Sequence, residues 1–238
     1  MERAAARAWP AAEREAIDGW VWRCSGGGGR RANSVLPLAF DGQDLAASIA
    51  AVEGRYRAHK LKSYFQVSSI AEPPGLDAAL AERSYQFEEP TLLLAKQLLP
   101  SSMPDGVVVA VDPDPGWMDI YTTALDATRV AEVPAILARV PAPRAFFTVR
   151  LGGEAIATAL GVLSPDGIVV VECVATSPGR RRTGAARLVM DALEAWASGQ
   201  GATVAALQVI ESNAPARALY GQRGYCRAGS YHYRWRQV

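Results

Sequence analysis

Cysteine is scarce in this chain, and the few cysteines are far apart. The 238 residues include Cys24, Cys173 and Cys226, and no two of them form a CxxC pair. A disulfide framework usually has an even set of cysteines, and many zinc sites begin with a CxxC pair. We therefore expect reduced thiols in a cytoplasmic protein, with neither a disulfide nor a metal site.

Long apolar segments and an excess of one charge are also missing. No apolar run approaches the ~20 residues of a membrane-spanning helix. The first residues carry charges throughout, so they do not resemble the apolar centre of a signal peptide. The formal net charge of +1 argues against a general nucleic-acid or membrane-surface binder. Positive charge is almost all arginine and alanine is abundant, which indicates a bacterial gene rich in G and C.

What is present is the composition of a folded protein with a sizeable core. Hydrophobic residues make up 50% of the chain and charged residues 21%. This length is generous for one small α/β domain and sufficient for two. Four prolines between Leu99 and Pro115 place a boundary near Pro104. We expect one unit over residues 1–104 and a second over 105–238, and both a monomer and a homodimer stay open.

The segment from Ile168 to Met190 predicts a buried strand, a short loop and a helix. An apolar, β-branched run with one charge, Glu172, is followed by Ser177-Pro178-Gly179 and then by apolar residues at helical spacing. A loop that leads directly into a helix presents unpaired N–H groups and the positive end of the helix dipole. The intervening Arg181–Ala186 adds arginines and small residues. We interpret this junction as a pyrophosphate-binding loop.

The order of residues in this loop excludes two common nucleotide sites. A P-loop ends in Gly-Lys-Ser/Thr, and a dinucleotide fold has GxGxxG directly after its strand, and neither is present. A second pattern follows a short apolar strand at residues 203–210. In it, Asn213 is suited to begin a helix, Ala216 is small enough to lie beneath a ligand, and Gly224 ends the helix.

Together the two patterns resemble the GNAT superfamily of acetyl-CoA-dependent N-acetyltransferases. Arg181-x-x-Gly184-x-Ala186 is similar to the acetyl-CoA signature R/Q-x-x-G-x-G/A of that family. The residues from Asn213 match its second pattern, N-x-x-A-x-x-L-Y-x-x-x-G-F/Y, with Tyr220 and Tyr225 at the two aromatic positions. The resemblance covers about the second half of the chain. It implies an α/β fold whose mixed central sheet splays apart.

The resemblance also implies a reaction, the transfer of an acetyl group from acetyl-CoA to a primary amine of a small molecule or peptide. The backbone amide of Val174 would polarise the thioester carbonyl. Tyr220 would protonate the departing thiolate. The implied cofactor contacts are Val174, Ala175, Thr176, Arg181, Arg182, Thr183, Gly184, Ala185, Ala186, Arg187, Asn213, Ala216 and Tyr220. No metal, nucleic acid or membrane is implied.

Glu172 is the one charged residue of the central strand. Burial of a carboxylate without partners costs several kcal/mol, so Glu172 is expected to face the cleft or to be hydrogen-bonded. Two roles stay open, a general base for the incoming ammonium and a structural or substrate-binding carboxylate. Strand alternation predicts the side chain of Cys173 on the opposite face.

The first half of the chain echoes the second. Arg83-Ser84-Tyr85 takes the place of Arg223-Gly224-Tyr225, and Leu80 falls where the second half has Tyr220. No counterpart of the phosphate loop is present. We interpret the first half as a smaller, degenerate GNAT-like domain that shapes the acceptor site, and an unrelated α+β cap stays open.

Several elements of the first half are predicted from pattern alone. We expect a helix over residues 2–17, a hairpin of strands 19–24 and 31–38, and a last strand over 225–236 that closes the sheet. Arg31 and Asn33 share one face of their strand by alternation, so both could point toward a substrate. Trp20 and Trp22 belong either to that surface or to the core of the first half.

Two other functions remain possible. One is a CoA-binding sensor or interaction module without turnover, although such a protein would not need Tyr220. The other is a protein N-terminal acetyltransferase, which would need an open peptide groove where the first half lies. The two motifs both follow Asp105, so a fragment from that residue is expected to keep cofactor binding.

Overall fold

A computed structural model describes residues 1–238. In chain order the elements are α1 (Glu2–Ala8), β1 (Glu13–Ile17), β2 (Trp20–Cys24), α2 (Leu45–Ala58), β3 (Ser63–Ser68), α3 (Leu76–Glu82), β4 (Gln86–Gln97), β5 (Val107–Ala110), α4 (Pro115–Thr122), α5 (Ala127–Arg139), β6 (Arg144–Leu151), β7 (Glu154–Leu163), β8 (Ile168–Thr176), α6 (Ala185–Gly199), β9 (Val204–Ile210), α7 (Ala214–Gln222) and β10 (Cys226–Arg236). None of these helices combines the length and the apolar character of a membrane span.

Eight of the ten strands form one mixed sheet. Its strand order is β3-β10-β4-β9-β8-β7-β6-β5, and β1 and β2 form a separate hairpin. The pair β8–β9 is parallel and every other pair in the sheet is antiparallel. This confirms the α/β fold class with a mixed sheet that the sequence predicted.

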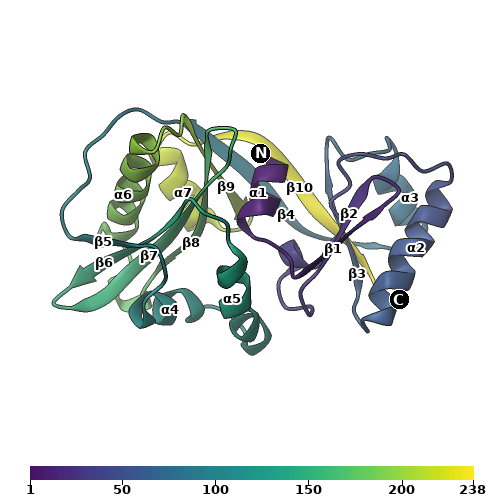
Figure 1. Ribbon diagram of the computed structural model, residues 1–238, viewed down its shortest axis with the longest axis horizontal. Helices are drawn as coiled ribbons and strands as arrows, with labels where there is room; N and C mark the ends of the chain where they lie inside the picture. Colours follow the sequence, from purple (N-terminus) through teal and green to yellow (C-terminus); the bar gives the residue numbers. More distant parts are fainter.

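The last strand of each half lies in the sheet of the other half. Strand β4, from the first half, pairs with β9 and β10, and β10, from the second half, pairs with β3 and β4. Figure 1 shows the result, with the C-terminus beside α2 among the elements of the first half. The two halves on either side of Pro104 therefore share one sheet. The prediction that residues 225–236 close the sheet is wrong, because β10 lies in its interior.

Helices cover both faces of the second half of the sheet. On one face α6 packs with α7 against apolar residues such as Phe147, Val169 and Leu207. On the other face α4, α5 and the N-terminal helix α1 cover Phe146 and Val170. The first half contributes a helix to the core of the second as well as a strand to its sheet.

The first half has its own smaller core between β2, β3, α2 and α3. Trp20 and Trp22 are buried there with Phe65 and Tyr56. The ring of Trp20 packs edge-on against Phe65, with centroids 5.4 Å apart. These tryptophans therefore belong to the core and not to a recognition surface.

The two halves repeat one buried polar arrangement. In each, a glutamate of the main helix binds an arginine and a tyrosine that follow the short helix. These groups are Glu53–Arg83–Tyr85 and Glu194–Arg223–Tyr225. The tyrosine hydroxyl lies 3.3 Å from the carboxylate in the first half and 3.1 Å in the second. The short helix also ends alike, because the amides of Tyr85 and Tyr225 each donate to a carbonyl five residues earlier at 3.0 Å.

The predicted N-terminal helix is too long. Helix α1 ends at Ala8, because Pro10 disfavours helical backbone at Trp9, which has φ −125° and ψ 75°. The chain then forms β1, which turns into β2 through Asp18-Gly19, both at positive φ. Asp-Gly is a favoured pair in the tight turn of a hairpin, so the sequence contains a local signal for this turn.

The predicted strand over residues 31–38 is also wrong. Residues Arg30–Ala32 form a short 3₁₀ turn, and only single bridges follow, Val21 with Leu36 and Val35 with Phe65. The side chain of Asn33 closes the preceding glycine loop, accepting from the amides of Ser25 and Gly27 at 2.7 and 2.9 Å. It is 4% exposed and does not point toward a substrate.

The exchanged strands make a direct prediction about fragments. The sequence suggested that a fragment from Asp105 keeps cofactor binding, but the structure argues against this. We expect residues 105–238 alone to lack a cooperative thermal transition, because removal of β4 leaves β9 without its antiparallel neighbour and takes away the apolar side chains of α1. Circular dichroism melts would measure this. Addition of residues 1–104 as a separate chain should restore the transition, and a cooperative melt of the second fragment alone would contradict the prediction.

Candidate active site

The site begins where strands β8 and β9 separate. They pair from Ile168–Val204 to Val171–Leu207, and no further pair follows. Strand β8 nevertheless continues to Thr176 and β9 to Ile210. Beyond Val171, the edge of β8 that faces β9 therefore has no strand partner, and a wedge-shaped opening lies between the ends of these two strands. This is the splayed sheet that the sequence predicted.

A β-bulge in β8 accompanies the separation. The register against β7 shifts between the pairs Leu160–Glu172 and Thr158–Ala175, and Cys173 has a φ of +55°. A bulge bends its strand and breaks the alternation of side chains. The prediction that Cys173 faces away from Glu172 is therefore wrong, since both side chains line the same cavity. Burial raises the pKa of the Cys173 thiol strongly, and this does not favour a nucleophilic role.

A cavity of about 1670 Å³ occupies the opening between the strand ends and the start of α6. It holds together nearly all the residues that the resemblance assigned to the cofactor. Those lining it are Val174, Ala175, Thr176, Arg181, Arg182, Gly184, Ala185, Ala186, Arg187, Asn213, Ala216 and Tyr220. Thr183 does not line it, and its hydroxyl instead donates to the carbonyl of Arg180 at 2.7 Å.

The loop before α6 has the geometry of an anion site. Arg182 and Gly184 both have positive φ, +60° and +88°, which turns successive amides toward one side. Gly184 precedes α6 without any side-chain cap, and the first intrahelical bond runs from the Leu188 amide to the Gly184 carbonyl. The amides of the first helical residues are thus unpaired within the helix, and such unpaired amides are suited to bind an anion.

The equivalent helix in the first half is closed to anions. Helix α2 begins after Asp44, whose carboxylate accepts from the amides of Ala46 and Ala47 at 2.8 and 3.2 Å. A negative side chain therefore already occupies the position that a phosphate would take. In the first half, the place of the phosphate loop is therefore taken by a helix start that Asp44 caps.

A second cavity, of about 300 Å³, lies on the other side of the opening. Both halves of the chain form its walls. The aromatic lining is Trp9, Tyr121, Tyr220, Tyr231 and Tyr233, and the loop Gly28–Arg31 lies at its edge. The two cavities share four lining residues, Val174, Asn213, Ala216 and Tyr220. They therefore meet at the bulged end of β8 and the helix α7.

Glu172 lies in this second cavity, paired with an arginine from the first half. Nη1 of Arg31 donates to both carboxylate oxygens, at 2.7 and 2.5 Å. The Glu172 side chain is 4% exposed, and the Arg31 guanidinium also lies 5.0 Å from the centre of the Trp9 ring. Burial lowers the pKa of Arg31, but the charge of Glu172 more than offsets this and the net shift is upward. Glu172 thus both faces the cleft and has a partner.

The loop that carries Arg31 is anchored to α5. The carboxylate of Glu132 accepts from the amides of Gly28 and Gly29, at 2.5 and 2.9 Å. A side chain at Gly28 would collide with this carboxylate, since an added Cβ would lie 2.6 Å from it. Neither Glu132 nor the Arg31–Glu172 pair was predicted. The sequence signal was the four-glycine run followed by two arginines, but the partners lie more than 100 residues away.

Tyr220 lies on α7 at the junction of the cavities. Asn213 begins this helix by accepting from the Ala216 amide at 3.2 Å, and Gly224 follows it at φ +82°. Burial, with a further contribution from the Glu172 charge, raises the pKa of Tyr220 to about 12. The phenol is therefore protonated at neutral pH.

The two histidines lie outside both cavities. His232 hydrogen-bonds Asp77 at 2.7 Å and stacks on Phe87. His59 lies beside Cys24, with its Nδ1 3.8 Å from Sγ. Neither belongs to the acceptor site.

Comparison with known proteins agrees with this geometry. The profile of the family described as "Probable histone acetyltransferase Rv0428c C-terminal" matches residues 1–236. The chain is 29% identical over 245 residues to the uncharacterized N-acetyltransferase YobR of Bacillus subtilis, covering 98% of this chain and 96% of that protein. It is 30% identical over 210 residues to the probable histone acetyltransferase Rv0428c of Mycobacterium tuberculosis, covering 85% of this chain and 63% of that protein.

Solved structures show the same fold. A GCN5-related N-acetyltransferase from Kribbella flavida superposes with a TM-score of 0.69 at 20% identity, covering 100% of this chain and 94% of the other. A tandem GNAT protein from the clavulanic acid biosynthesis pathway gives a TM-score of 0.62 at 13% identity, covering 81% and 69%. With the family profile matching almost the whole chain, the protein belongs to the Rv0428c C-terminal acetyltransferase family and is a GNAT acyl-CoA N-acyltransferase.

Proposed function

We propose that this enzyme transfers the acetyl group of acetyl-CoA to a primary amine of a small molecule or peptide that enters the smaller cavity. One observation carries the proposal. The large cavity, with its anion-binding loop, and the smaller cavity, with its buried ion pair, meet at Val174 and Tyr220. A thioester bound from one side would meet an amine bound from the other at that junction.

The two halves would then have different tasks. Residues 105–238 supply the strand ends, the loop and the helix start that would hold the pantetheine arm and the pyrophosphate. Residues 1–104 supply Trp9 and Arg31 to the acceptor cavity, and Thr91 of β4 joins them from the exchanged strand. The three free thiols fit the expectation of a cytoplasmic protein.

The proposed chemistry is a direct transfer. The amine nitrogen attacks the thioester carbonyl carbon, a C–N bond forms, the C–S bond breaks, and the ammonium proton is lost to water or to a carboxylate. The Val174 amide lies on the stretch of β8 without a β9 partner, where an N–H group is available to the developing oxyanion.

Tyr220 would act on the sulfur leaving group. A thiol has a pKa near 8.5 and Tyr220 a pKa of about 12, so complete proton transfer would be uphill by about 5 kcal/mol. The phenol therefore donates a hydrogen bond that stabilises the thiolate as it forms. The proton moves completely from Tyr220 to the sulfur only when the resulting phenolate is stabilised, for example by the positive charge on the reacting amine.

Glu172 would bind and orient the amine. Arg31 already donates to both of its oxygens, so the carboxylate is held in a fixed position in the cavity. A carboxylate oxygen has further lone pairs that can accept from an ammonium group. We therefore assign Glu172 to amine binding, with proton removal through water.

The size and charge of the smaller cavity favour a small acceptor. About 300 Å³ accommodates a small molecule or one side chain, at the low end of the range for ligand sites. Its charged lining residues are balanced in sign, namely Arg30, Arg31 and Arg129 with Glu89, Glu132 and Glu172. A cationic histone tail would be expected to meet an acidic surface. A non-catalytic CoA sensor would not need the Tyr220 phenol at the junction.

A turnover screen tests the proposal. Release of free thiol from acetyl-CoA would be followed with small primary amines, single amino acids, lysine peptides and peptides with a free N-terminus. Small amines should give turnover that depends on Tyr220. Turnover with long peptides alone would favour a protein acetyltransferase, and saturable binding of acetyl-CoA without turnover on any amine would favour a sensor.

The first variant separates chemistry from binding. Tyr220→Phe keeps the ring and removes the proton donor, so we expect kcat to fall by roughly 10²–10⁴ with little change in acetyl-CoA affinity. Tyr225→Phe is the matched control, because that hydroxyl binds Glu194 and lines neither cavity. A Tyr220→Phe enzyme with the wild-type rate would reduce Tyr220 to a packing residue.

The second variant tests the anion site. Gly184→Asp places a carboxylate where the cofactor phosphates would bind, at a φ of +88° that L-residues rarely adopt. Acetyl-CoA at a hundred times its Kd should stabilise the wild type by about 2.7 kcal/mol, seen as a thermal shift, and should barely shift the variant. Gly199→Asp, at the far end of α6 in open space, is the control. Equal shifts for wild type and Gly184→Asp would disprove this placement.

The third variant tests the ion pair between the halves. Arg31→Met leaves the Glu172 carboxylate buried and unpaired, which should destabilise the fold by about 3 kcal/mol. The KM for the amine should rise about tenfold while the KM for acetyl-CoA stays constant. In the double variant Arg31→Met/Glu172→Gln, the stability should return to the wild-type value, but the KM for the amine should stay raised. Arg55→Met, which removes only an exposed pair with Glu15, is the control. Equal changes in both KM values would contradict the assignment.

A further inference from the structure

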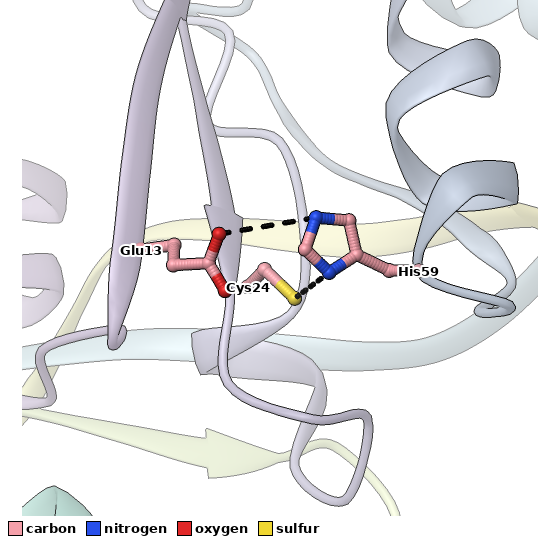
Figure 2. A group of neighbouring side chains, drawn as sticks. All are labelled: Glu13, Cys24 and His59. Carbon is pink, nitrogen blue, oxygen red and sulfur yellow. Dashed lines mark hydrogen bonds and ion pairs between the residues drawn. The ribbon is translucent and has the colours of Figure 1, made fainter.

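Three possible metal ligands from separate segments meet in the first half of the chain, away from both cavities. Glu13 lies on β1, Cys24 ends β2, and His59 follows the last residue of α2 (Figure 2). The Sγ of Cys24 lies 3.8 Å from Nδ1 of His59, and Oε2 of Glu13 lies 3.8 Å from Nε2. One ligand atom from each of the three residues lies within 4.8 Å of the others.

The separation between Cys24 and His59 fits a small tetrahedral cation, and Glu13 lies close enough to complete the site after a change of rotamer. Zinc binds thiolate sulfur at about 2.3 Å and imidazole nitrogen or carboxylate oxygen at about 2.0–2.2 Å. Ligand atoms around one such ion are therefore roughly 3.3–3.8 Å apart. Thiolate, imidazole and carboxylate are together a zinc-type donor set, whereas magnesium or calcium would require oxygen ligands. We propose that Glu13, Cys24 and His59 bind one zinc-like divalent cation, with water as the fourth ligand.

The exposure of the three side chains allows an ion to enter. Cys24 is buried, but the side chains of His59 and Glu13 are 35% and 60% exposed. Cys24 and Glu13 lie beside different nitrogens of the imidazole ring (Figure 2), and one ion binds only one of these nitrogens. Glu13 must therefore change its rotamer when the ion binds. Glu13 is exposed at the start of β1, so its side chain is free to do so.

The position of the site in the chain suggests what the ion stabilises. Cys24 is followed by the glycine loop, whose Gly28 and Gly29 amides bind Glu132 and which leads to Arg31 in the acceptor cavity. An ion that ties Cys24 to the end of α2 would fix the first residue of this loop. This link to the acceptor site rests on the proposed function, but the cation site itself does not.

Cobalt(II) is a suitable probe because its bonds to thiolate absorb light. The full chain, first stripped with a chelator, would be titrated with Co²⁺ alone and then with Zn²⁺. We expect one Co²⁺ per chain, a thiolate-to-cobalt absorption with tetrahedral bands, and displacement by Zn²⁺. Zn²⁺ at about a hundred times its Kd should raise Tm by roughly 5–10 °C.

Variants identify the ligands. Cys24→Ser and His59→Gln should abolish the thiolate absorption or weaken binding at least about tenfold, and Glu13→Gln should weaken it less. Cys226→Ser, which removes the exposed cysteine, is the control and should bind as the wild type does. His59→Gln and Glu13→Gln change side chains that are not buried, so they test the site even if Cys24→Ser does not fold.

Three results would overturn the proposal. One is the absence of stoichiometric binding to the wild type, and another is unchanged binding by His59→Gln. The third is loss of the absorption in Cys226→Ser, which would place the ion at the exposed thiol. None of these results depends on turnover, so they would leave the proposed acetyltransferase function untouched.

Discussion

The antiparallel pairing of β4 with β10 holds the two halves of this chain in one sheet. Each strand ends its own half and lies beside the strand that precedes the short helix of the other half. Each exchanged strand also forms an ion pair with the other half. Lys96 of β4 binds Glu194 at 2.5 Å, and Arg236 of β10 lies 3.6 Å from Glu53. Neither half can complete its sheet alone, and each buried glutamate receives one further cation from the other half. The smaller cavity lies over these central strands because both halves meet there.

The repeated structure shows how the two halves differ at the start of the main helix, which is open in the second half and capped in the first. Both have a main helix whose glutamate binds an arginine and a tyrosine, and both have a parallel contact before that helix, Val171–Leu207 in the second half and Val35–Phe65 in the first. They differ at the start of the helix. Gly184 leaves the amides of α6 unpaired, whereas Asp44 caps those of α2 with its own carboxylate. The first half thus lacks the arginine-rich loop, and the Asp44 carboxylate also pairs the helix amides that an anion would need.

The first half acts on the second through a few specific contacts. Trp9 and Arg31 reach the cavity of Glu172, and Gly28 and Gly29 fasten their loop to Glu132. Without Arg31 the carboxylate of Glu172 would be buried without a partner, which is costly in a low-dielectric site. The bulge at Cys173 accompanies the separation of β8 from β9, and it brings Cys173 to the same cavity as Glu172.

The sequence by itself determined the local features of this enzyme. The strand at Ile168, the loop at Arg181, the helix after Asn213 and the tyrosine at 220 are set by nearby residues, so their place in a GNAT fold could be read from spacing. It also contained a local signal for the β1–β2 hairpin, the Asp18-Gly19 pair at its turn.

Only the tertiary structure decided the contacts between distant segments. Four features depend on how the strands pair and on where one of them bulges. These are the exchange of β4 and β10, the pairing of Glu172 with Arg31 from 141 residues away, the face on which Cys173 lies, and the meeting of Glu13, Cys24 and His59. Such pairings follow from the burial of whole faces and from long-range register, and local propensity contains neither. Residues close in sequence therefore specified the motifs, while the fold specified which charges those motifs would meet.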